Sequence, residues 1–371
     1  MGNINRCGKI DWNNLVYTSD KDDITKYSLQ TNDLLFNRTN SSEWVGKTAI
    51  YKGEKTAIYA GYIVRLRVII LDADYVNFVM NSSYYRGWCN DVKTDAVNQS
   101  NINAQKLSHF FIPIPPLNEQ KRIVNELSSW LNIIEAINKE KSDLQSTICL
   151  AKSKILELAI HGNLVPQDSN DEPASELLKR INPKAEITCD NPQYAKLPKG
   201  WILTKVKDVF SINPKNKAET TQAAGFIPMT NICEGFKNQY SFETKEWGKI
   251  ESGFTHFADG DIAVAKISPC LENRKSMVLS NLPNGIGAGT TELHVFRPLC
   301  VDALYGLYFF KSDCFIKNCV GTFNGVVGQQ RVGKSIVEEI HFPLPPLSEQ
   351  HRIVTKIEEL LAQLDKIEAS L

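Results

Sequence analysis

The sequence of 371 residues holds 42 basic and 42 acidic residues, so its formal net charge is zero. This balance argues against indiscriminate nucleic-acid binding, which needs a strongly basic surface, and any DNA contact must use local basic faces. No apolar run approaches the ~20 residues that cross a bilayer, and the first residues do not resemble a signal peptide. We therefore expect a cytoplasmic protein of two or three domains without membrane contact.

Nine cysteines are scattered along the chain, without a Cys-x-x-Cys pair and without histidines at ligand spacing. An odd, dispersed set is typical of reduced, mostly buried thiols. The sequence therefore predicts no disulfide framework and no metal site.

An internal repeat of more than one hundred residues organises the chain. Pro-Ile-Pro-Pro-Leu-Asn-Glu-Gln-Lys-Arg-Ile-Val at residues 113–124 matches Pro-Leu-Pro-Pro-Leu-Ser-Glu-Gln-His-Arg-Ile-Val at 343–354, an offset of 230. Upstream, an offset of 228 aligns Asp33 with Asp261, Asp74 with Asp302 and Met1 with Met229. A match of this length indicates a tandem duplication.

Each copy opens with short strands between Gly, Asn and Pro turns, as at 57–71 and 294–297. A helix is expected next, at 73–88 and at 302–319, because aromatic and aliphatic residues recur three and four positions apart. The Pro-x-Pro-Pro segment then favours an extended entry into a second helix.

Asn118 and Ser348 are the expected N-caps of these second helices, the first of which runs to about residue 160. Both helices carry an apolar seam with alternating spacings of four and three, formed by Ile123, Leu127, Trp130, Ile134 and Ile137 and by Ile353, Ile357, Leu360, Leu364 and Ile367. Such a narrow seam favours a partner helix, whereas a helix on a globular core usually shows a wider stripe. Lys141 interrupts the first seam, and either sets its register or lies beyond the end of a shorter partner.

A polar linker follows Gly162 and leads to a short helix from Ala174 to about Ile181. The second globular domain begins near Leu-Pro-Lys-Gly-Trp at 197–201.

Two mixed domains, each followed by Pro-x-Pro-Pro-Leu-x-Glu-Gln-x-Arg-Ile-Val and a heptad helix, resemble the specificity subunits of type I restriction-modification enzymes. Further matching motifs lie at residues 159–168, 197–201, 226–232, 260–262 and 328–330. The resemblance covers essentially the whole chain. It implies an α/β (α+β) fold with pseudo-two-fold symmetry, divided into target recognition domain 1 (1–112), spacer helix 1 (113–162), a linker with a short helix (163–196), target recognition domain 2 (197–342) and spacer helix 2 (343–371).

The resemblance also implies a function. Each recognition domain would read one half of a bipartite site in double-stranded DNA, while the two helices pair antiparallel and dock methyltransferase and restriction subunits. S-adenosylmethionine, ATP and Mg are expected on those partner subunits, so this chain would hold no catalytic centre, cofactor or metal. A coiled-coil scaffold that joins proteins without touching DNA is the alternative.

The first domain starts later in the repeat than the second. The second domain opens near Trp201, 28 residues before Met229, whereas Met1 aligns with Met229 itself. We therefore expect an N-terminally truncated first domain that leaves a strand edge and part of a core uncovered. Such a chain should be poorly soluble alone or associate with itself, and should specify at most one half-site unless a second polypeptide completes the domain.

Two polar loops in each copy are candidates for DNA contact, because Arg, Lys, Asn and Gln suit base edges and Lys, Arg, Ser and Thr suit phosphates. The first loops carry Asn37, Arg38, Ser41 and Ser42 in one copy and Lys266, Ser268, Arg274 and Lys275 in the other. The second loops carry Gln99 and Asn101, and Gln329, Gln330 and Arg331. Solvated turns favour the same residue types, so this alternative stays open.

Asp33 and Asp261 hold matching positions but share no second carboxylate or histidine at a repeated spacing. General acid–base chemistry needs such a partner, so a structural turn role is expected for both. The Gly-rich stretch 285–289 lacks the Lys-Ser/Thr of a P-loop and is interpreted as a tight turn.

Overall fold

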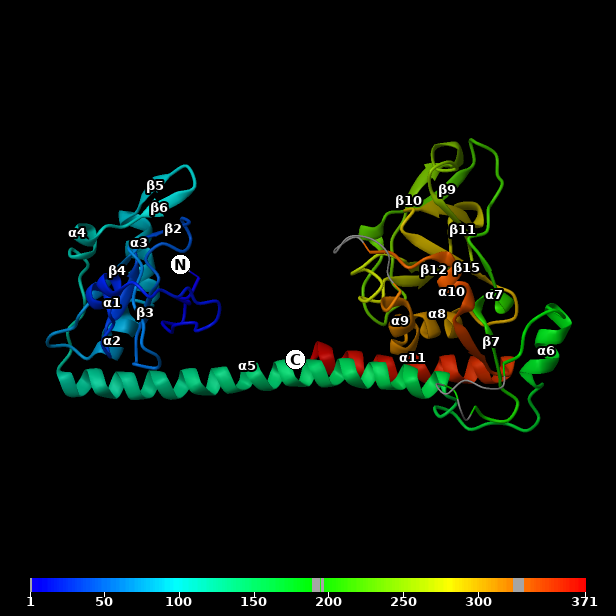
Figure 1. Ribbon diagram of the computed structural model, residues 1–371, viewed down its shortest axis with the longest axis horizontal. Helices are drawn as coiled ribbons and strands as arrows, with labels where there is room; N and C mark the ends of the chain where they lie inside the picture. Colours follow the sequence, from blue (N-terminus) through cyan, green and yellow to red (C-terminus); the bar gives the residue numbers. More distant parts are fainter. Residues whose placement is uncertain (1, 189–193, 195–196, 323–329) are drawn as a thin grey trace. The chain divides into compact units, whose positions relative to one another are not determined.

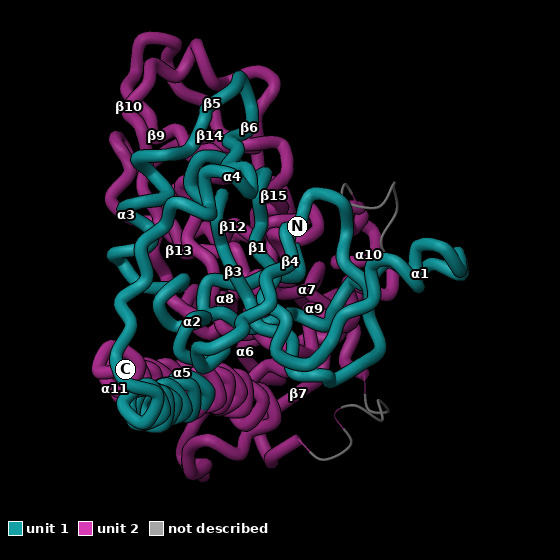
Figure 2. The backbone as a smooth tube through the Cα atoms, turned by 90° about the vertical axis from the view of Figure 1, so that its left-hand side faces the viewer, with its two compact units in different colours: residues 1–139 teal, residues 140–371 magenta. Residues whose placement is uncertain are grey.

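The structure, a computed structural model, describes residues 2–188, 194, 197–322 and 330–371. The chain divides into two compact units, residues 1–139 (unit 1) and 140–371 (unit 2) (Figure 2). The 44-residue helix α5 (Leu117–Ile160) contributes residues to both. Within the described ranges, no helix combines the length and apolar character that a membrane span requires.

Unit 1 is a small α+β unit built on a three-stranded antiparallel sheet of order β3-β1-β4 (Figure 1). The sheet and its helices comprise β1 (Leu34–Asn37), β3 (Thr48–Ile50), β4 (Ile63–Leu66), α1 (Lys21–Tyr27), α2 (Ala73–Val79), α3 (Ser83–Val92) and α4 (Ala104–Leu107). A second sheet, of order β2-β6-β5, joins β2 (Thr39–Asn40), β6 (Gln99–Asn101) and β5 (Thr94–Ala96). The core lies between β1 and the helices, where Leu34, Phe36 and Tyr85 are almost fully buried.

Unit 2 repeats this plan with more strands. Its main sheet has the order β13-β12-β15-β8 and contains β8 (Phe210–Ile212), β12 (Ile262–Ala265), β13 (Ser276–Val278) and β15 (Leu293–Pro298). A second sheet, β10-β9-β14-β11, contains β9 (Ala223–Ile227), β10 (Glu243–Glu246), β11 (Thr255–Ala258) and β14 (Ile286–Gly289), and a pair joins β7 (Ile202–Lys205) to β16 (His341–Leu344). The helices are α6 (Ala174–Ile181), α7 (Val206–Val209), α8 (Ala303–Lys311), α9 (Asp313–Val320), α10 (Lys334–Glu339) and α11 (Leu347–Ala369).

Each unit has two helices where the sequence predicted one after the strands, α2 and α3 in unit 1 and α8 and α9 in unit 2. The hydroxyl of Ser82 accepts a hydrogen bond from Tyr85 N (3.3 Å), and that of Ser312 accepts one from Phe315 N (3.2 Å). Each serine is therefore the N-cap of a new helix, which breaks the predicted segments 73–88 and 302–319.

A glutamine fixes the start of each second helix. Gln120 Oε1 accepts from Asp72 N (2.9 Å) and its amide donates to Pro115 O (2.8 Å). Gln350 makes the same two bonds, to Asp302 N (2.7 Å) and Pro345 O (3.0 Å). We call each arrangement a glutamine clasp. It identifies Asp72 as the counterpart of Asp302, so the alignment of Asp74 with Asp302 is wrong by two residues.

These helices begin at Leu117 and Leu347, one residue before the expected caps. Asn118 and Ser348 therefore lie in the first turn, and the prediction that they are N-caps is wrong. Pro346 precedes α11 without a side-chain cap. The clasp ties the first turn of each helix to the segment just before it and to the start of α2 or α8.

Within unit 2, the end of α5 packs antiparallel on α11, which confirms part of the predicted helix pair (Figure 1). Ile148, Ile353 and Ile357 are buried, whereas Leu360 and Leu364 are half-buried and Ile367 is exposed. The ammonium of Lys152 lies between Asp365 (2.6 Å) and Glu368 (2.7 Å). Lys141 donates to the carbonyl of Leu371, so it meets the end of the shorter partner.

The seam predicted at the start of α5 is not buried. Ile123 is half-buried, and the other four side chains are exposed, namely Leu127 (40%), Trp130 (57%), Ile134 (51%) and Ile137 (58%). Helix α11 has 23 residues against 44 in α5, so it is too short to cover the longer helix along its whole length. The expectation that a partner helix covers the whole seam is therefore wrong for Leu127 and Ile134.

Candidate nucleic-acid interface

The small sheet of unit 1 joins the two polar loops that the sequence analysis selected. Strands β2 and β6 pair in the register Thr39↔Asn101 and Asn40↔Ser100, and Asn101 Nδ2 donates to Thr39 Oγ1 (2.8 Å). Loops about sixty positions apart in the sequence thus form one surface with β5 (Figure 1). Neither the spacing nor the residue types had predicted this pairing.

The selected residues of this surface are not equally accessible. Arg38, Ser41, Ser42 and Gln99 are exposed, whereas Asn37 is fully buried. The Asn37 side-chain oxygen accepts from Thr39 N (3.3 Å), which is a turn contact. Asn37 is therefore positioned to shape the loop rather than to contact a ligand.

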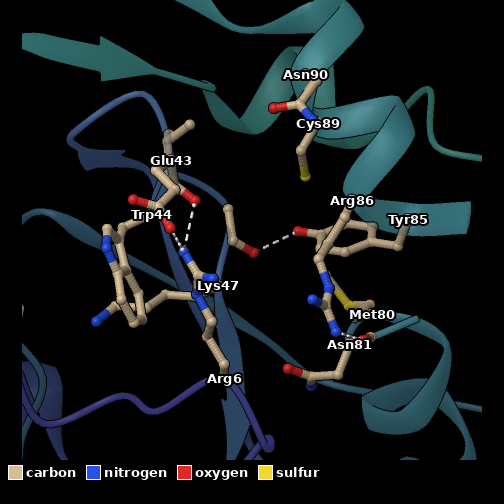
Figure 3. A pocket seen from close by; sticks show the side chains of 12 residues that line it. Arg6, Glu43, Trp44, Lys47, Met80, Asn81, Tyr85, Arg86, Cys89 and Asn90 are labelled. Atoms are coloured by element: carbon tan, nitrogen blue, oxygen red, sulfur yellow. Dashed lines mark hydrogen bonds and ion pairs between the residues drawn. The ribbon is translucent and has the colours of Figure 1, made fainter. Parts of the chain in front are cut away.

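A cationic cluster that sequence reasoning missed borders the same loop (Figure 3). The guanidinium of Arg6 lies 3.7 Å from the ring centroid of Trp44 and pairs with Glu43 (2.6 Å), while Lys47 Nζ is 4.9 Å from the same ring. Burial, followed by the charge of Arg6, lowers the pKa of Lys47. In the sequence, Trp44 three positions before Lys47 could have indicated a cation next to an aromatic ring, but nothing pointed to Arg6.

Unit 2 brings its two loops together in the same way. Ile267 and Arg331 form an antiparallel bridge, Ser268 N donates to Gln330 O (2.9 Å), and Val332 N donates to Lys266 O (2.9 Å). Gln329 lies outside the described residues.

Arg331 has the most defined geometry in this second surface. Its Nε and one terminal nitrogen donate to the two carboxylate oxygens of Glu292, at 2.8 and 2.9 Å. The hydrogen bond from Arg331 is the main cause of the lowered pKa of Glu292. The charged pair holds the guanidinium of an exposed arginine in a fixed plane.

Three other candidates in unit 2 are engaged within the unit. Arg274 donates to Lys311 O (3.0 Å) and Ser153 Oγ (3.1 Å) and pairs with Asp313. Lys275 Nζ donates to Met229 O (3.3 Å), and Ser268 Oγ donates to Glu272 (2.6 Å). The side chains of Arg274 and Lys275 are also mostly buried (16% and 15% exposed), whereas that of Arg331 stays 43% exposed beside Glu292. Structural roles are therefore favoured for the first two, which leaves Lys266, Gln330 and Arg331 as the stronger candidates.

Comparison with known proteins identifies the family. The model of the type I restriction modification DNA specificity domain matches residues 3–146 and 198–371. The chain belongs to this family. The two matched segments correspond to the two copies of the repeat, which confirms the resemblance drawn from the duplicated motif.

Curated relatives of this specificity-domain protein are named as specificity subunits of type I restriction enzymes. The specificity subunit of the type I restriction enzyme EcoAI from Escherichia coli is 40% identical over 273 residues, which cover 67% of this chain and 46% of the relative. A putative type I restriction enzyme specificity subunit, MjaX from Methanocaldococcus jannaschii, is 24% identical over 371 residues, covering 95% and 77%. The chain thus spans about half the length of the first of these.

Solved structures share the fold. A structure of the assembly and conformational transition of a type I R-M system aligns with a TM-score of 0.64 at 14% identity, covering 100% of this chain and 84% of the other. The HsdS subunit from Thermoanaerobacter tengcongensis aligns with a TM-score of 0.50 at 14% identity, covering 100% and 83%. At these identities the likeness shows the fold alone.

The paired aspartates of this family member have structural roles. Asp33 accepts from Gln30 N (2.8 Å) and from Arg67 (2.9 Å), and Asp261 accepts from Ala258 N (2.7 Å) and from Arg297 (2.8 Å). The expected turn role is confirmed. In the part of the chain that the structure describes, no group of three or more His, Cys, Asp or Glu residues is arranged to hold a metal ion.

Proposed function

We propose that this chain reads double-stranded DNA, with each repeat presenting one recognition surface to one half of a bipartite site. The observation that carries the proposal is the joining of two distant polar loops by backbone hydrogen bonds in both units. The two surfaces have the same backbone plan but different side chains, Arg38, Gln99 and Asn101 against Lys266, Gln330 and Arg331. Two readers of different half-sites need this combination.

The side chains fit the two kinds of DNA contact. The guanidinium fork of Arg331 suits the O6 and N7 acceptors of guanine, and the amide of Gln330 suits the N6 and N7 of adenine. Glu292 holds Arg331 in plane before DNA arrives and so reduces the ordering that binding requires. Lys266, Arg38 and the Arg6–Lys47 cluster suit phosphates, which would position each unit on the duplex.

The proposal includes partner proteins and excludes catalysis by this chain. The names of the relatives, which are specificity subunits of type I restriction enzymes, support an assembly with further subunits. We assign docking of methyltransferase and restriction subunits to the helices α5 and α11. S-adenosylmethionine, ATP and Mg chemistry is assigned to those partners.

The test combines methylation mapping with binding measurements. The chain is co-expressed with a type I methyltransferase subunit, and genomic methylation defines the site. Arg331→Ala is then compared with Arg180→Ala. Arg180 is also an exposed arginine paired with both oxygens of one glutamate, Glu172, but lies on α6.

Arg331→Ala is expected to weaken binding to the methylated site by about 10- to 100-fold, equivalent to roughly 1–3 kcal/mol for a bidentate base contact, with a smaller loss on random DNA. Arg180→Ala should leave both unchanged. Equal losses on both DNAs would make Arg331 a phosphate anchor. A chain that directs no methylation, and whose partner binding survives charge reversal at Lys266 and Arg331, would be a protein scaffold instead.

A further inference from the structure

Unit 1 has an apolar groove beside strand β4, with a volume of about 340 Å³. Its wall combines side chains from the sheet, from α2 and from the segment before α5, among them Leu34, Leu66, Val68, Val76, Met80 and Ile112. We call this the β4 groove. None of these residues belongs to the DNA-facing loops, so the inference stands apart from the proposed function.

The same place in unit 2 is filled by one side chain. Phe210 of β8 packs against Phe296, Phe310 and Phe342, with ring centroids 5.9, 5.4 and 5.4 Å apart. At the offset of 230 that also relates Asp72 to Asp302, the counterparts of these three rings are Leu66, Met80 and Ile112. All three line the β4 groove. The β4 groove of unit 1 therefore corresponds to the site that Phe210 of β8 fills in unit 2.

The backbone shows the same difference. In unit 2, β15 pairs with β12 on one side and with β8 on the other, in the register Phe296↔Ile212 to Pro298↔Phe210. In unit 1, β4 pairs with β1, and no strand among the described residues occupies its other edge. An unpaired edge next to an apolar groove is a template for an added strand.

A second edge lies where α5 begins. In unit 2, β16 pairs with β7, and Leu344 is fully buried. Its counterpart in unit 1 is Ile114, which is 67% exposed, and the nearby Phe111 is 83% exposed. Residues 111–114 form no strand.

A polar contact marks the end of this edge. Glu349 is buried and accepts from the indole of Trp201 (2.9 Å) and from Gln167 (2.9 Å). Its counterpart, Glu119, is 41% exposed and pairs only with Arg122 of its own helix among the described residues. The Glu119 carboxylate is thus positioned as an acceptor for an indole.

We propose that the β4 groove and the 111–119 edge together bind a strand-forming segment of a separate polypeptide, with the chemistry of residues 197–212. Its tryptophan would donate to Glu119, its first strand would pair with 111–114, and its phenylalanine would fill the groove while its second strand pairs with β4. In unit 2, the segment 201–212 contacts Glu349, β16, the three phenylalanine rings and β15 in that order. Their counterparts in unit 1 are Glu119, residues 111–114, the β4 groove and β4.

The test adds a synthetic peptide of residues 197–212 to the intact chain. Fluorescence anisotropy measures affinity, and hydrogen exchange locates the site. Saturable binding is expected, with new protection at 63–68 and 111–119 and no change at 293–298. A Phe210→Ala peptide should bind at least tenfold more weakly, whereas a Lys207→Ala peptide should bind as the parent does, because Lys207 pairs with Glu339 at the surface of unit 2.

A protein variant tests the groove from the other side. Ile112→Lys should abolish binding, and Val97→Lys, at a 99% exposed position, should not. Absence of protection at 63–68, or equal affinity for the Phe210→Ala peptide, would overturn the proposal. So would concentration-dependent protection of the same segments without peptide, together with a dimer in sedimentation, because the occupant would then be a second copy of the chain.

Discussion

The two units contain the same motif in two environments. Gln120 and Gln350 make identical clasps, and Asp33 and Asp261 make equivalent turn contacts. These contacts form both in unit 2, where β8 covers the edge of the sheet, and in unit 1, where no described strand does. The motif's glutamate differs, because Glu349 is buried against Trp201 whereas Glu119 reaches solvent. The clasps and the aspartate turns thus form in both copies of the repeat. The contacts of Glu349 and Arg352 instead need Trp201 and Asp171, which lie far away in the sequence.

The largest contrast is expected at the ring that fills the core of unit 2. Phe210→Ala removes a side chain that is 2% exposed and opens a cavity among three phenylalanines, which should cost about 3–5 kcal/mol. Phe111→Ala in unit 1, at an 83% exposed position, should change stability by less than about 0.5 kcal/mol. Urea unfolding measures both. Equal losses would mean that Phe111 is covered in solution.

A second contrast lies along one helix. Ile148 on α5 is 3% exposed and Ile134 is 51% exposed, although Ile148 lies two heptads after Ile134 and so continues the same seam. Ile148→Ala should cost about 2–4 kcal/mol and Ile134→Ala less than about 0.5 kcal/mol. Local hydrogen exchange in α5 and α11 measures the effect. A large cost at Ile134 would show that another helix covers it in solution.

Lys311 provides a pH-dependent contrast, because its counterpart in unit 1 is Asn81. The Lys311 ammonium is buried against Gly235 O (2.7 Å) and Arg274 O (2.8 Å), and burial, then the Arg274 charge, lowers its pKa from 10.5 to about 7. The unfolded chain binds one more proton between these values, so stability should rise from pH 7 to 10.5, by up to about 1.4 kcal/mol per pH unit.

Lys311→Met should remove that rise, whereas Asn81→Met should leave the slope unchanged. Urea unfolding at a series of pH values measures both slopes. An unchanged slope in Lys311→Met would show that this lysine does not titrate in the window.

The smallest contrast concerns the arginine of the motif. Arg352 pairs with both oxygens of Asp171, at 2.6 and 3.3 Å, and this bonding raises its pKa. Arg352 is 36% exposed, so Arg352→Ala should cost only about 1 kcal/mol. Arg122→Ala, at a side chain that is 76% exposed, should leave the free energy of unfolding almost unchanged. A double mutant with Asp171→Ala should show coupling only for Arg352.

Sequence reasoning located what is periodic or repeated. The duplication, the end of α5 near Ile160 and the bounds of α6 were predicted correctly. The heptad pattern could not reveal how much of the seam is buried, because burial depends on the length of the partner helix. Side-chain polarity also could not separate buried Asn37 from exposed Arg38, and the pairing of β2 with β6 left no local trace.

The glutamine clasps have a consequence for how this chain can change. Apart from the glutamine amide itself, each clasp uses only main-chain atoms, those of an aspartate and of a proline five residues before the glutamine. Such a joint does not depend on the side chains between those points. Substitutions between Asp72 and Pro115, or between Asp302 and Pro345, therefore leave the clasp bonds themselves in place as long as the backbone is kept. The limit on such changes comes from packing instead, because Tyr85 and Phe310 lie in the cores of their units.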